Sequence, residues 1–352
     1  MSTLRTLDYG HLATGTASQR KRFIQELVAG LGEAGFVKLV NHGFDDHKLS
    51  DVFNWVSPAS SLLTWKHPMS LPVLSVQSKT FFGQPLEAKN SISSPAGLRP
   101  RRGYTGVSVE TSSNADPDVS KRGLLRDAKE HFDQGSENDR EYANQWLTVQ
   151  GLTGFRPFMV AFYKQCEVVN LTLIQAVEAG FGLEAGCLVA RCIPNNTDLR
   201  ITHYPALSVE AVRTGGMTRI APHTDFGVIT LLFQDSTGGL EIEDRTRPGV
   251  YHPLPPTNTR EMIVNVGDTL QRWTNGRLFS GRHRVTVPES LGDDAEELPE
   301  RYSVAYLGKA QRHASVGPVA SFVSVDNPAK YNDLNAQEYL NMRAQLVSSV
   351  GN

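Results

Sequence analysis

Apolar residues recur at helical spacing near the start of the chain. In residues 17–34 the apolar side chains share one face and the charged ones the other, which predicts an amphipathic helix. Gly35 follows directly, as is typical of a helix C-terminus. The short apolar run 36–40 predicts a strand, and a second helical pattern begins at about Asp46.

The second helical pattern is interrupted by residues 56–77. This segment holds three prolines and many serines and has no usable period. When it is removed, the apolar positions on its two sides return to helical spacing. It begins with Val-Ser, which codons starting with GT can encode, and ends with Gln, which CAG encodes. We interpret residues 56–77 as a retained in-frame intron or a recent insertion; a genuine surface loop is the alternative.

The rest of the chain changes from loops to a long helix and then to strands. Residues 88–135 are polar and rich in Gly, Pro and Ser, which predicts mostly loop. Residues 153–182 form the longest helical pattern and are apolar on more than one face, so we expect this helix to be buried against a sheet. Short β-patterned runs separated by turns follow, at residues 199–204, 228–233, 240–243, 262–266, 283–287 and 302–307.

This order of elements predicts an α+β fold. Several short strands with turn signals between them favour a β-sandwich or a jelly roll. The longest helical pattern would flank that core, packed on one of its sheets. We find no internal repeat in the chain.

Composition narrows the class of protein. The 352 residues are 39% hydrophobic and 20% charged with a net charge of −2, so the basic excess of a nucleic-acid binder is missing. No run approaches the roughly 20 apolar residues needed to span a bilayer, and the N-terminus lacks an apolar signal core. Three irregularly spaced cysteines fit neither a disulfide framework nor a zinc site, and we expect Cys166 to be a buried free thiol. We therefore expect a cytoplasmic protein.

His223 and Asp225 form an H-x-D pair in the run PHTDFG. Side chains two positions apart on an extended segment point to the same side, so an imidazole nitrogen and a carboxylate oxygen can reach one metal ion. An H-x-D pair is common by chance, and taken alone it favours an exposed turn in which both side chains cap backbone groups. The strand pattern that follows at 228–233 favours the metal site.

His283 begins a later strand pattern, so a jelly roll could bring it opposite the H-x-D pair. Two histidines and one carboxylate on one face of an ion leave positions open for other ligands. This arrangement suits non-haem Fe(II) that must accept O2 and a chelating co-substrate. Arg301 and Ser303 come next, two apart on a predicted strand, so both can hold one carboxylate; alone they would be surface strand residues.

The ordered motifs resemble a known family. HYP, HTDFGVITLLFQD, GGLEI, VNVGDTLQRWTNGRLFSGRHRV and RYSVAYL are similar to the 2-oxoglutarate/Fe(II) dioxygenases of the isopenicillin-N-synthase-like superfamily. GEAGFVKLVNHGF and FFGQPLEAK resemble its N-terminal region, so the similarity covers about residues 6 to 310. That superfamily includes many plant and fungal oxidases of secondary metabolism.

The resemblance implies a role for each matching residue. The H-x-D pair and His283 match the iron ligands. Arg301 and Ser303 match the residues that bind the distal carboxylate of 2-oxoglutarate, and Tyr204 matches a tyrosine that contacts the same co-substrate. For the substrate itself the sequence offers only Arg101, Tyr104 and His131, which stand in segments that could border the pocket; an exposed loop also explains the arginine.

The implied fold is a double-stranded β-helix, or jelly roll, flanked by helices. Residues 1–150 would form an N-terminal helical and mixed region. Residues 151–310 would form the catalytic domain, with its core at 199–309, and 311–352 a C-terminal segment with a helix.

The implied enzyme uses Fe(II), 2-oxoglutarate as co-substrate and O2, with ascorbate in support. It would hydroxylate, desaturate or rearrange a ring of a small molecule, as a monomer that binds neither nucleic acid nor membrane. One alternative is an oxidase of the same fold that does not use 2-oxoglutarate, which Arg301 and Ser303 argue against. The other is a binding or scaffold protein without turnover, which the intact ligand set argues against and the 56–77 segment keeps open.

Overall fold

The protein is built around two β-sheets, seen here in a computed structural model that describes residues 4–56, 81–94, 100–116, 120, 122–123, 125–257, 261–292 and 294–348. The strands are β1 Thr6–Asp8, β2 Phe36–Val40, β3 Gly103–Thr105, β4 Arg126–Asp127, β5 Glu130–Gln134, β6 Asp198–Tyr204, β7 Leu207–Ser208, β8 Met217–Thr218, β9 Ile220–His223, β10 Ile229–Gln234, β11 Leu240–Glu243, β12 Tyr251–Pro253, β13 Met262–Val266, β14 His283–Val285, β15 Glu297–Leu298 and β16 Arg301–Leu307. The helices are α1 Gly10–Ala13, α2 Ala17–Glu33, α3 Asp46–Val56, α4 Leu86–Asn90, α5 Phe155–Phe181, α6 Val209–Arg213, α7 Asp268–Trp273 and α8 Ala336–Ser348, with short 3-10 helices at Ser112–Ala115, Val189–Cys192 and Ala320–Phe322.

The two sheets face each other as a jelly roll. The larger sheet has the strand order β1-β2-β13-β10-β16-β6-β5-β3, and the smaller has β12-β11-β14-β9. All pairings in them are antiparallel except that of β1 with β2. Strands from both ends of the larger sheet come from the first 150 residues, so the N-terminal region extends the same sheet. This architecture confirms the predicted α+β jelly roll.

The predicted helices near the N-terminus are confirmed as α2 and α3. Thr16 caps α2 in a reciprocal capping box, since its side chain accepts from the Gln19 amide while its own amide donates to the Gln19 side chain. Gly35, with φ of +76°, ends the helix and turns the chain into β2. The apolar face of α2 is buried as expected.

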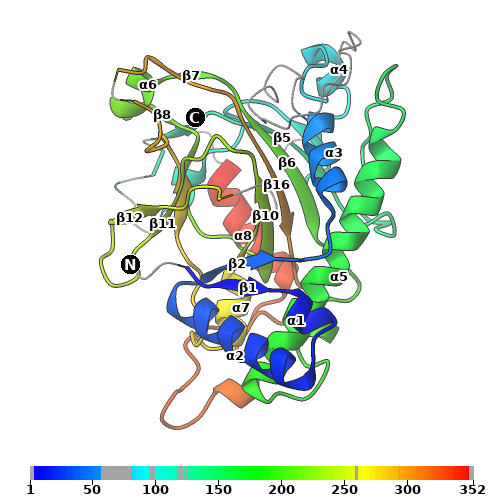
Figure 1. Ribbon diagram of the computed structural model, residues 1–352, viewed down its shortest axis with the longest axis vertical. Helices are drawn as coiled ribbons and strands as arrows, with labels where there is room; N and C mark the ends of the chain where they lie inside the picture. The colour runs from blue at the N-terminus through cyan, green and yellow to red at the C-terminus, as the bar shows by residue number, and fades with distance from the viewer. Residues whose placement is uncertain are drawn as a thin grey trace.

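Helix α5 lies along the larger sheet, on the side away from the smaller one (Figure 1). The Asn170 side chain donates to the Ile229 carbonyl of β10 at 3.3 Å, and the Tyr163 ring meets that of Tyr306 of β16 at 5.2 Å. Cys166 is a buried free thiol on this helix. The prediction of a long helix packed on a sheet is therefore confirmed.

The prediction that 88–135 is mostly loop is wrong for one central strand. Strand β5 is fully buried and pairs with β6. Its sequence, EHFDQ, has one apolar residue, Phe132, which packs against Phe155 of α5, while Asp133 faces the cavity between the sheets. A strand whose inner face is charged lacks the apolar alternation that predicts strands.

The segment 56–77 lies outside the described residues except for Val56, which ends α3. The residues on its two sides are nevertheless close, because the Phe81 amide donates to the Trp55 carbonyl at 3.0 Å. Both rings also pack against Phe155. Without the 22 residues 56–77, Phe81 would stand four positions after Trp55, which is the spacing of an α-helical hydrogen bond.

Helices able to cross a membrane are not found in the part of the chain that the structure describes.

Candidate metal centre and co-substrate pocket

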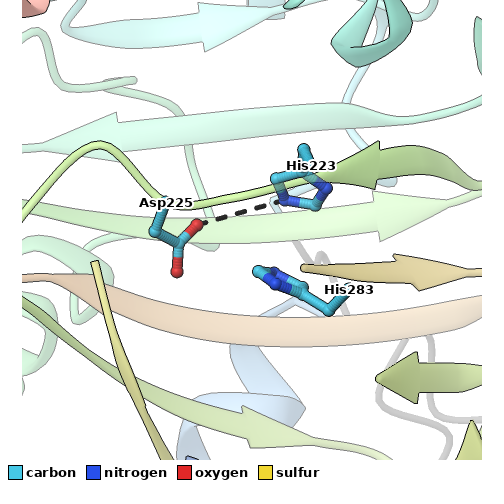
Figure 2. Close-up of side chains that lie close together, drawn as sticks. All are labelled: His223, Asp225 and His283. Carbon is cyan, nitrogen blue, oxygen red and sulfur yellow. Dashed lines mark ion pairs between the residues drawn. The ribbon is translucent and has the colours of Figure 1, made fainter. Parts of the chain in front are cut away.

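His223, Asp225 and His283 come together at the edge of the smaller sheet (Figure 2). His223 ends β9, and His283 begins β14 directly opposite it in the antiparallel pairing. The two imidazole rings are 4.3 Å apart, and His223 Nε2 lies 4.0 Å from Asp225 Oδ1. One potential ligand atom from each residue lies within 4.8 Å of the others. The spacing fits a single metal ion.

Both histidines are held in the orientation that a metal requires. His223 Nδ1 is 2.8 Å from the Ala221 carbonyl, and His283 Nδ1 is 3.2 Å from the Gly281 carbonyl. Because a carbonyl oxygen only accepts, each Nδ1 carries the proton, and each Nε2 keeps a free lone pair. Hydrogen bonds of this kind fix the tautomer of metal-binding histidines.

Asp225 is prepared in the same way. Its Oδ2 accepts a hydrogen bond from the Thr230 hydroxyl at 2.6 Å and from the Asn265 amide at 2.7 Å. Thr230 and Asn265 face each other across the β10–β13 pair. One carboxylate oxygen is thus occupied by the protein, and Oδ1 is left for an ion.

The electrostatics of the centre favour metal binding. Burial holds the pKa of His223 well below its usual value, and the adjacent His283 adds to this effect. Burial opposes ionisation of Asp225, but the two imidazoles and its hydrogen bonds outweigh burial and lower its pKa. Neutral imidazoles and an ionised carboxylate are the forms that bind a metal, so the donor set fits Fe(II).

A cavity of about 220 Å³ opens from these residues between the two sheets. The larger sheet contributes side chains of β5, β6, β10, β13 and β16, and the smaller sheet contributes those of β9, β11 and β14. Leu340, Ala344 and Val347 of α8 line it on a further side. The cavity is thus continuous with the candidate metal centre.

Arg301 lies at one end of this cavity and is 1% exposed. Its Nε donates to the Gly238 carbonyl at 3.0 Å and its Nη2 to the Gln234 side chain at 2.9 Å. Its buried Nη1 has no hydrogen-bond partner among the described residues. An unpaired buried guanidinium nitrogen is costly unless an acceptor arrives, which suits a carboxylate ligand.

Neighbouring side chains complete this end. Ser303 and Tyr204 also line the cavity, and the Arg301 guanidinium lies 4.8 Å from the centre of the Tyr204 ring. Arg219 is fully buried nearby, and within the part of the chain that the structure describes its Nε and Nη1 have no hydrogen-bond partner. Burial and the closeness of Arg301 lower the pKa of Arg219 to about 10. Two buried arginines make this end a fit for the distal carboxylate of 2-oxoglutarate.

The three residues suggested as substrate contacts fall in different places. Arg101 lines the cavity. Tyr104 is buried and donates to Glu130 at 2.5 Å, and His131 is 1% exposed; neither is among the residues that line the cavity. His203, next to the predicted Tyr204, lies 2.7 Å from Glu130 through its Nδ1.

Sequence reasoning missed the residues that support the site. Thr230 and Asn265 hydrogen-bond to Asp225, and Gln234 hydrogen-bonds to Arg301. Arg219 is a second buried cation close to Arg301. Thr230 stands five positions after Asp225, but the other three are far in sequence from the residues they support and meet them only in the folded chain.

Comparison with known proteins agrees with this geometry. Residues 185–309 match the model of the 2OG-Fe(II) oxygenase superfamily. The 2-oxoglutarate-dependent dioxygenase ecdK of Aspergillus rugulosus is 36% identical over 99% of this chain and 100% of its own length. The proline hydroxylase buaE of Petromyces alliaceus is 38% identical over 95% of this chain and 96% of its own.

A solved structure extends the comparison to the fold. A full-length protein of Neurospora crassa, solved in complex with alpha-KG and thymine, superposes with a TM-score of 0.80 at 27% identity, covering 97% of this chain and 96% of that one. Similarity of this extent covers both the sheets and the helices around them. The chain therefore belongs to the 2OG-Fe(II) oxygenase superfamily and is a 2-oxoglutarate-dependent dioxygenase.

Proposed function

We propose that His223, Asp225 and His283 hold one Fe(II) ion and that Arg301, Ser303 and Tyr204 hold 2-oxoglutarate. The observation that carries this proposal is the pairing of the polar atoms. Each ligand residue has one donor atom free while its other polar atom is bound to the protein. Arg301 likewise has one free nitrogen on the same cavity.

The bound iron and 2-oxoglutarate supply the activation of O2, which yields succinate, CO2 and an oxidised substrate. The protein supplies orientation. The carbonyls of Ala221 and Gly281 keep both imidazoles in one tautomer, and Thr230 and Asn265 keep Asp225 ionised and fixed. Arg301 fixes the far end of the co-substrate through a charge-assisted hydrogen bond.

Burial completes this preparation. The apolar side chains of α8 lie over the part of the cavity distant from Arg301, and Leu232, Leu240 and Val285 surround the part near it. These side chains limit the water that can reach the reacting groups.

Two alternatives are less well supported. An oxidase that does not use 2-oxoglutarate would have no need for a buried arginine with an unpaired nitrogen beside the metal centre. A scaffold protein without turnover would not retain free donor atoms on all three ligand residues. Both features favour an active 2-oxoglutarate enzyme.

Among the possible outcomes we favour hydroxylation of a small molecule, the reaction for which the relative buaE is named. The similarity to fungal dioxygenases supports a place in secondary metabolism. We also infer a monomer in the cytoplasm; the free thiols of the described cysteines are usual in a reducing compartment.

The test is a succinate assay on purified protein with Fe(II), ascorbate and 2-oxoglutarate. We expect slow succinate formation without substrate, none in His223→Ala, and a strong decrease in Arg301→Ala. Succinate formation unchanged in Arg301→Ala would overturn the assignment of 2-oxoglutarate. Tight zinc with no iron-dependent activity would instead favour the scaffold.

A further inference from the structure

The end of the cavity away from Arg301 has a wall of charged side chains. Arg101 precedes β3, Glu110 follows it, and Lys129 stands between β4 and β5. Asp133 of β5 and Arg200 of β6 complete this charged wall. The succinate chemistry described above uses none of these five side chains.

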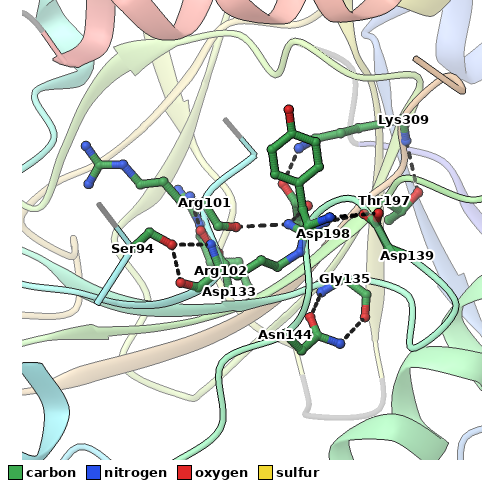
Figure 3. Close-up of polar contacts among 12 residues, drawn as sticks. Ser94, Arg101, Arg102, Asp133, Gly135, Asp139, Asn144, Thr197, Asp198 and Lys309 are labelled. Atoms are coloured by element: carbon green, nitrogen blue, oxygen red, sulfur yellow. Dashed lines mark hydrogen bonds and ion pairs between the residues drawn. The ribbon is translucent and has the colours of Figure 1, made fainter. Parts of the chain in front are cut away.

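Part of the charged wall is already paired. Arg200 donates to both oxygens of Asp133, at 2.7 and 2.8 Å. Next to it, Asp198 accepts from Arg102 and from Lys309, as Figure 3 shows. In both clusters the charged groups are hydrogen-bonded to each other and connect neighbouring segments of the chain.

Lys129 is different. Its side chain is 5% exposed, yet its ammonium lies 3.6 Å from Asp127 and 3.8 Å from Glu110 and makes no hydrogen bond within the described part of the chain. An ammonium has three donors, and burying it without acceptors is costly. Lys129 therefore presents unused donors to the cavity that it lines.

Glu110 is the matching acid. Its ion pairs, with Arg200 at 3.3 Å and with Lys129 and His131 at 3.8 Å, all involve Oε2. Its Oε1 has no partner among the described residues. Burial opposes ionisation of Glu110, but Arg200, Lys129 and Arg101 outweigh it and hold its pKa well below the usual range. A charged oxygen thus faces the cavity beside Lys129.

Arg101 adds a second incompletely paired cation. Its side chain extends away from Arg102 and Asp198 in Figure 3, and its buried Nε has no hydrogen-bond partner in the described ranges of the chain. It lies close enough to Glu110 to stabilise that carboxylate. Unused donors and an unused acceptor are therefore neighbours on the same wall.

The five side chains of the charged wall, taken with the adjacent Asp127, carry no net charge. Three cations face three anions: Arg101, Lys129 and Arg200 against Asp127, Glu110 and Asp133. Burial keeps His131 neutral among them by lowering its pKa to about 3. A ligand with a net charge would leave one buried charge without a counter-ion. A ligand with one positive and one negative group leaves none.

The opposite side of this space is apolar. Leu340, Ala344 and Val347 of α8 line it, and the Val347 carbonyl accepts from the Thr111 amide at 3.2 Å, which fixes α8 over the wall. The whole cavity, about 220 Å³, must also hold 2-oxoglutarate. Sites for drug-sized ligands run from about 300 Å³ upwards, so the room left suits a small molecule.

We propose that the substrate is a free α-amino acid with a compact apolar side chain. Lys129 and Arg101 bind its carboxylate, Glu110 binds its ammonium group, and the apolar side chain lies under α8. This inference rests on the proposed function and names the substrate class of the same site. Lys129 and Glu110 are specificity-determining residues, since together they read both charged ends of the ligand.

The experiment is a calorimetric titration, without O2, of the protein loaded with Fe(II) and saturating 2-oxoglutarate. The ligands are apolar L-amino acids, each with its N-acetyl and methyl ester derivatives. We expect at least one free amino acid to bind about tenfold or more tightly than both of its derivatives, because each derivative loses one charged hydrogen bond. Equal binding of the free and blocked forms would overturn the proposal, and so would binding of none.

Variants separate the two ends of the ligand. Glu110→Gln should weaken the free amino acid about tenfold or more and leave the N-acetyl derivative almost unchanged, because that derivative has no ammonium to lose. Lys129→Met should weaken the free amino acid about tenfold or more and leave the methyl ester almost unchanged, because the ester has no carboxylate to lose. Equal weakening of free and blocked ligands would show a structural role and contradict the assignment. Glu87→Gln and Lys164→Met, both on exposed positions, are the matched controls.

The two proposals fail in different ways. If the wild-type protein converts 2-oxoglutarate to succinate but no amino acid binds, the substrate class is wrong and the dioxygenase function stands. If succinate is never formed, the proposed function is wrong, whatever the titration shows.

Discussion

The proposed iron site and the charged wall line the same cavity but differ in how their polar groups are paired. At the proposed iron site, each of the three ligand residues has one side-chain atom hydrogen-bonded to the protein, at 2.6 to 3.2 Å, and one atom left for a metal. At the charged wall, Lys129 and Glu110 face each other at 3.8 Å with no hydrogen bond between them. The side chains of the proposed iron site are held in place by the protein, as ligands of fixed geometry require. The charged wall has no net charge together with Asp127, and some of its donor atoms remain available to a ligand.

This difference has a functional meaning. A metal ion and a chelating co-substrate need exact placement, which short hydrogen bonds to the ligands provide. A substrate that differs from one enzyme to the next needs a wall whose charges can be exchanged without disturbing the metal.

Loss of a ligand should abolish the centre. We expect His283→Ala to bind no stoichiometric iron and to form no succinate, because two remaining ligands cannot complete the facial set. Metal analysis of the purified variant measures this directly. His252→Ala, a change at a histidine that pairs with Asp244 away from the cavity, is the control. Full iron occupancy in His283→Ala would contradict the site.

The Arg301 end should be sensitive to shape as well as to charge. We expect Arg301→Lys to raise the KM for 2-oxoglutarate about tenfold or more, since an ammonium cannot hold Gly238, Gln234 and a carboxylate in the geometry of a guanidinium fork. Initial rates at varied 2-oxoglutarate give the value. Arg245→Lys, on an exposed loop, should leave the KM unchanged. An unchanged KM in Arg301→Lys would show that charge alone is enough.

Supports of Asp225 should matter nearly as much. Removing one hydrogen bond to its Oδ2, by Thr230→Val or Asn265→Ala, should weaken iron binding or activity by about 10–100-fold. The measurement is the iron concentration that gives half-maximal succinate formation. Thr214→Val, whose hydroxyl bonds only within α6, is the matched change. If Thr230→Val and Thr214→Val behave alike, Asp225 needs no such support.

The burial of His131 beside the charged wall should make the stability of the protein depend on pH. Burial, then the charge of Arg200, and also Lys129 lower the pKa of His131 to about 3. Glu110 and Asp133 act in the opposite direction but are outweighed. The unfolded chain therefore binds a proton that the folded chain does not, and stability falls as the pH drops below about 6.5 towards 3. We expect His131→Asn to lose less stability than the wild type between about pH 7 and pH 5.

Denaturant unfolding at each pH supplies the measurement for His131→Asn. His47→Asn, at an exposed position of α3, should keep the wild-type pH dependence. An identical slope in His131→Asn and the wild type would mean that His131 does not stay neutral in the fold.

The smallest effect concerns residues 56–77, outside the cavity. We propose that these residues interrupt a helix. Without them, Phe81 would follow Trp55 by four positions, the spacing of an α-helical hydrogen bond, and the Phe81 amide does donate to the Trp55 carbonyl. The deletion variant should fold with an unchanged or higher melting temperature and form succinate. Sequencing of the transcript tests the intron origin, and a message that keeps this segment at full abundance would contradict it. A deletion variant that does not fold would favour a genuine loop.

The positions of the strands can be predicted from the sequence only where their apolar residues follow a regular pattern. Strands β6, β10, β13 and β16 alternate or run apolar against α5, so their positions could be predicted closely. Strand β5 could not, because the face opposite Phe132 carries His131 and Asp133 instead of apolar residues. Asp133, which makes the strand hard to predict from sequence, also belongs to the charged wall.

The candidate site follows the same rule. The proposed iron ligands and Arg301 could be singled out because ordered motifs surround them. Arg101 was expected near the substrate and does line the cavity, whereas the Tyr104 hydroxyl bonds to Glu130. Glu110 and Lys129 come from separate loops, and no short spacing joins them. Pairing of charges across loops is a property of the folded chain alone.

The most direct test of the account is a crystal structure of the protein grown without O2 in the presence of Fe(II) and 2-oxoglutarate. We predict anomalous iron density within bonding distance of His223 Nε2, Asp225 Oδ1 and His283 Nε2, with the distal carboxylate of 2-oxoglutarate on Arg301 Nη1. Iron bound elsewhere, or 2-oxoglutarate placed with no contact to Arg301, would contradict it.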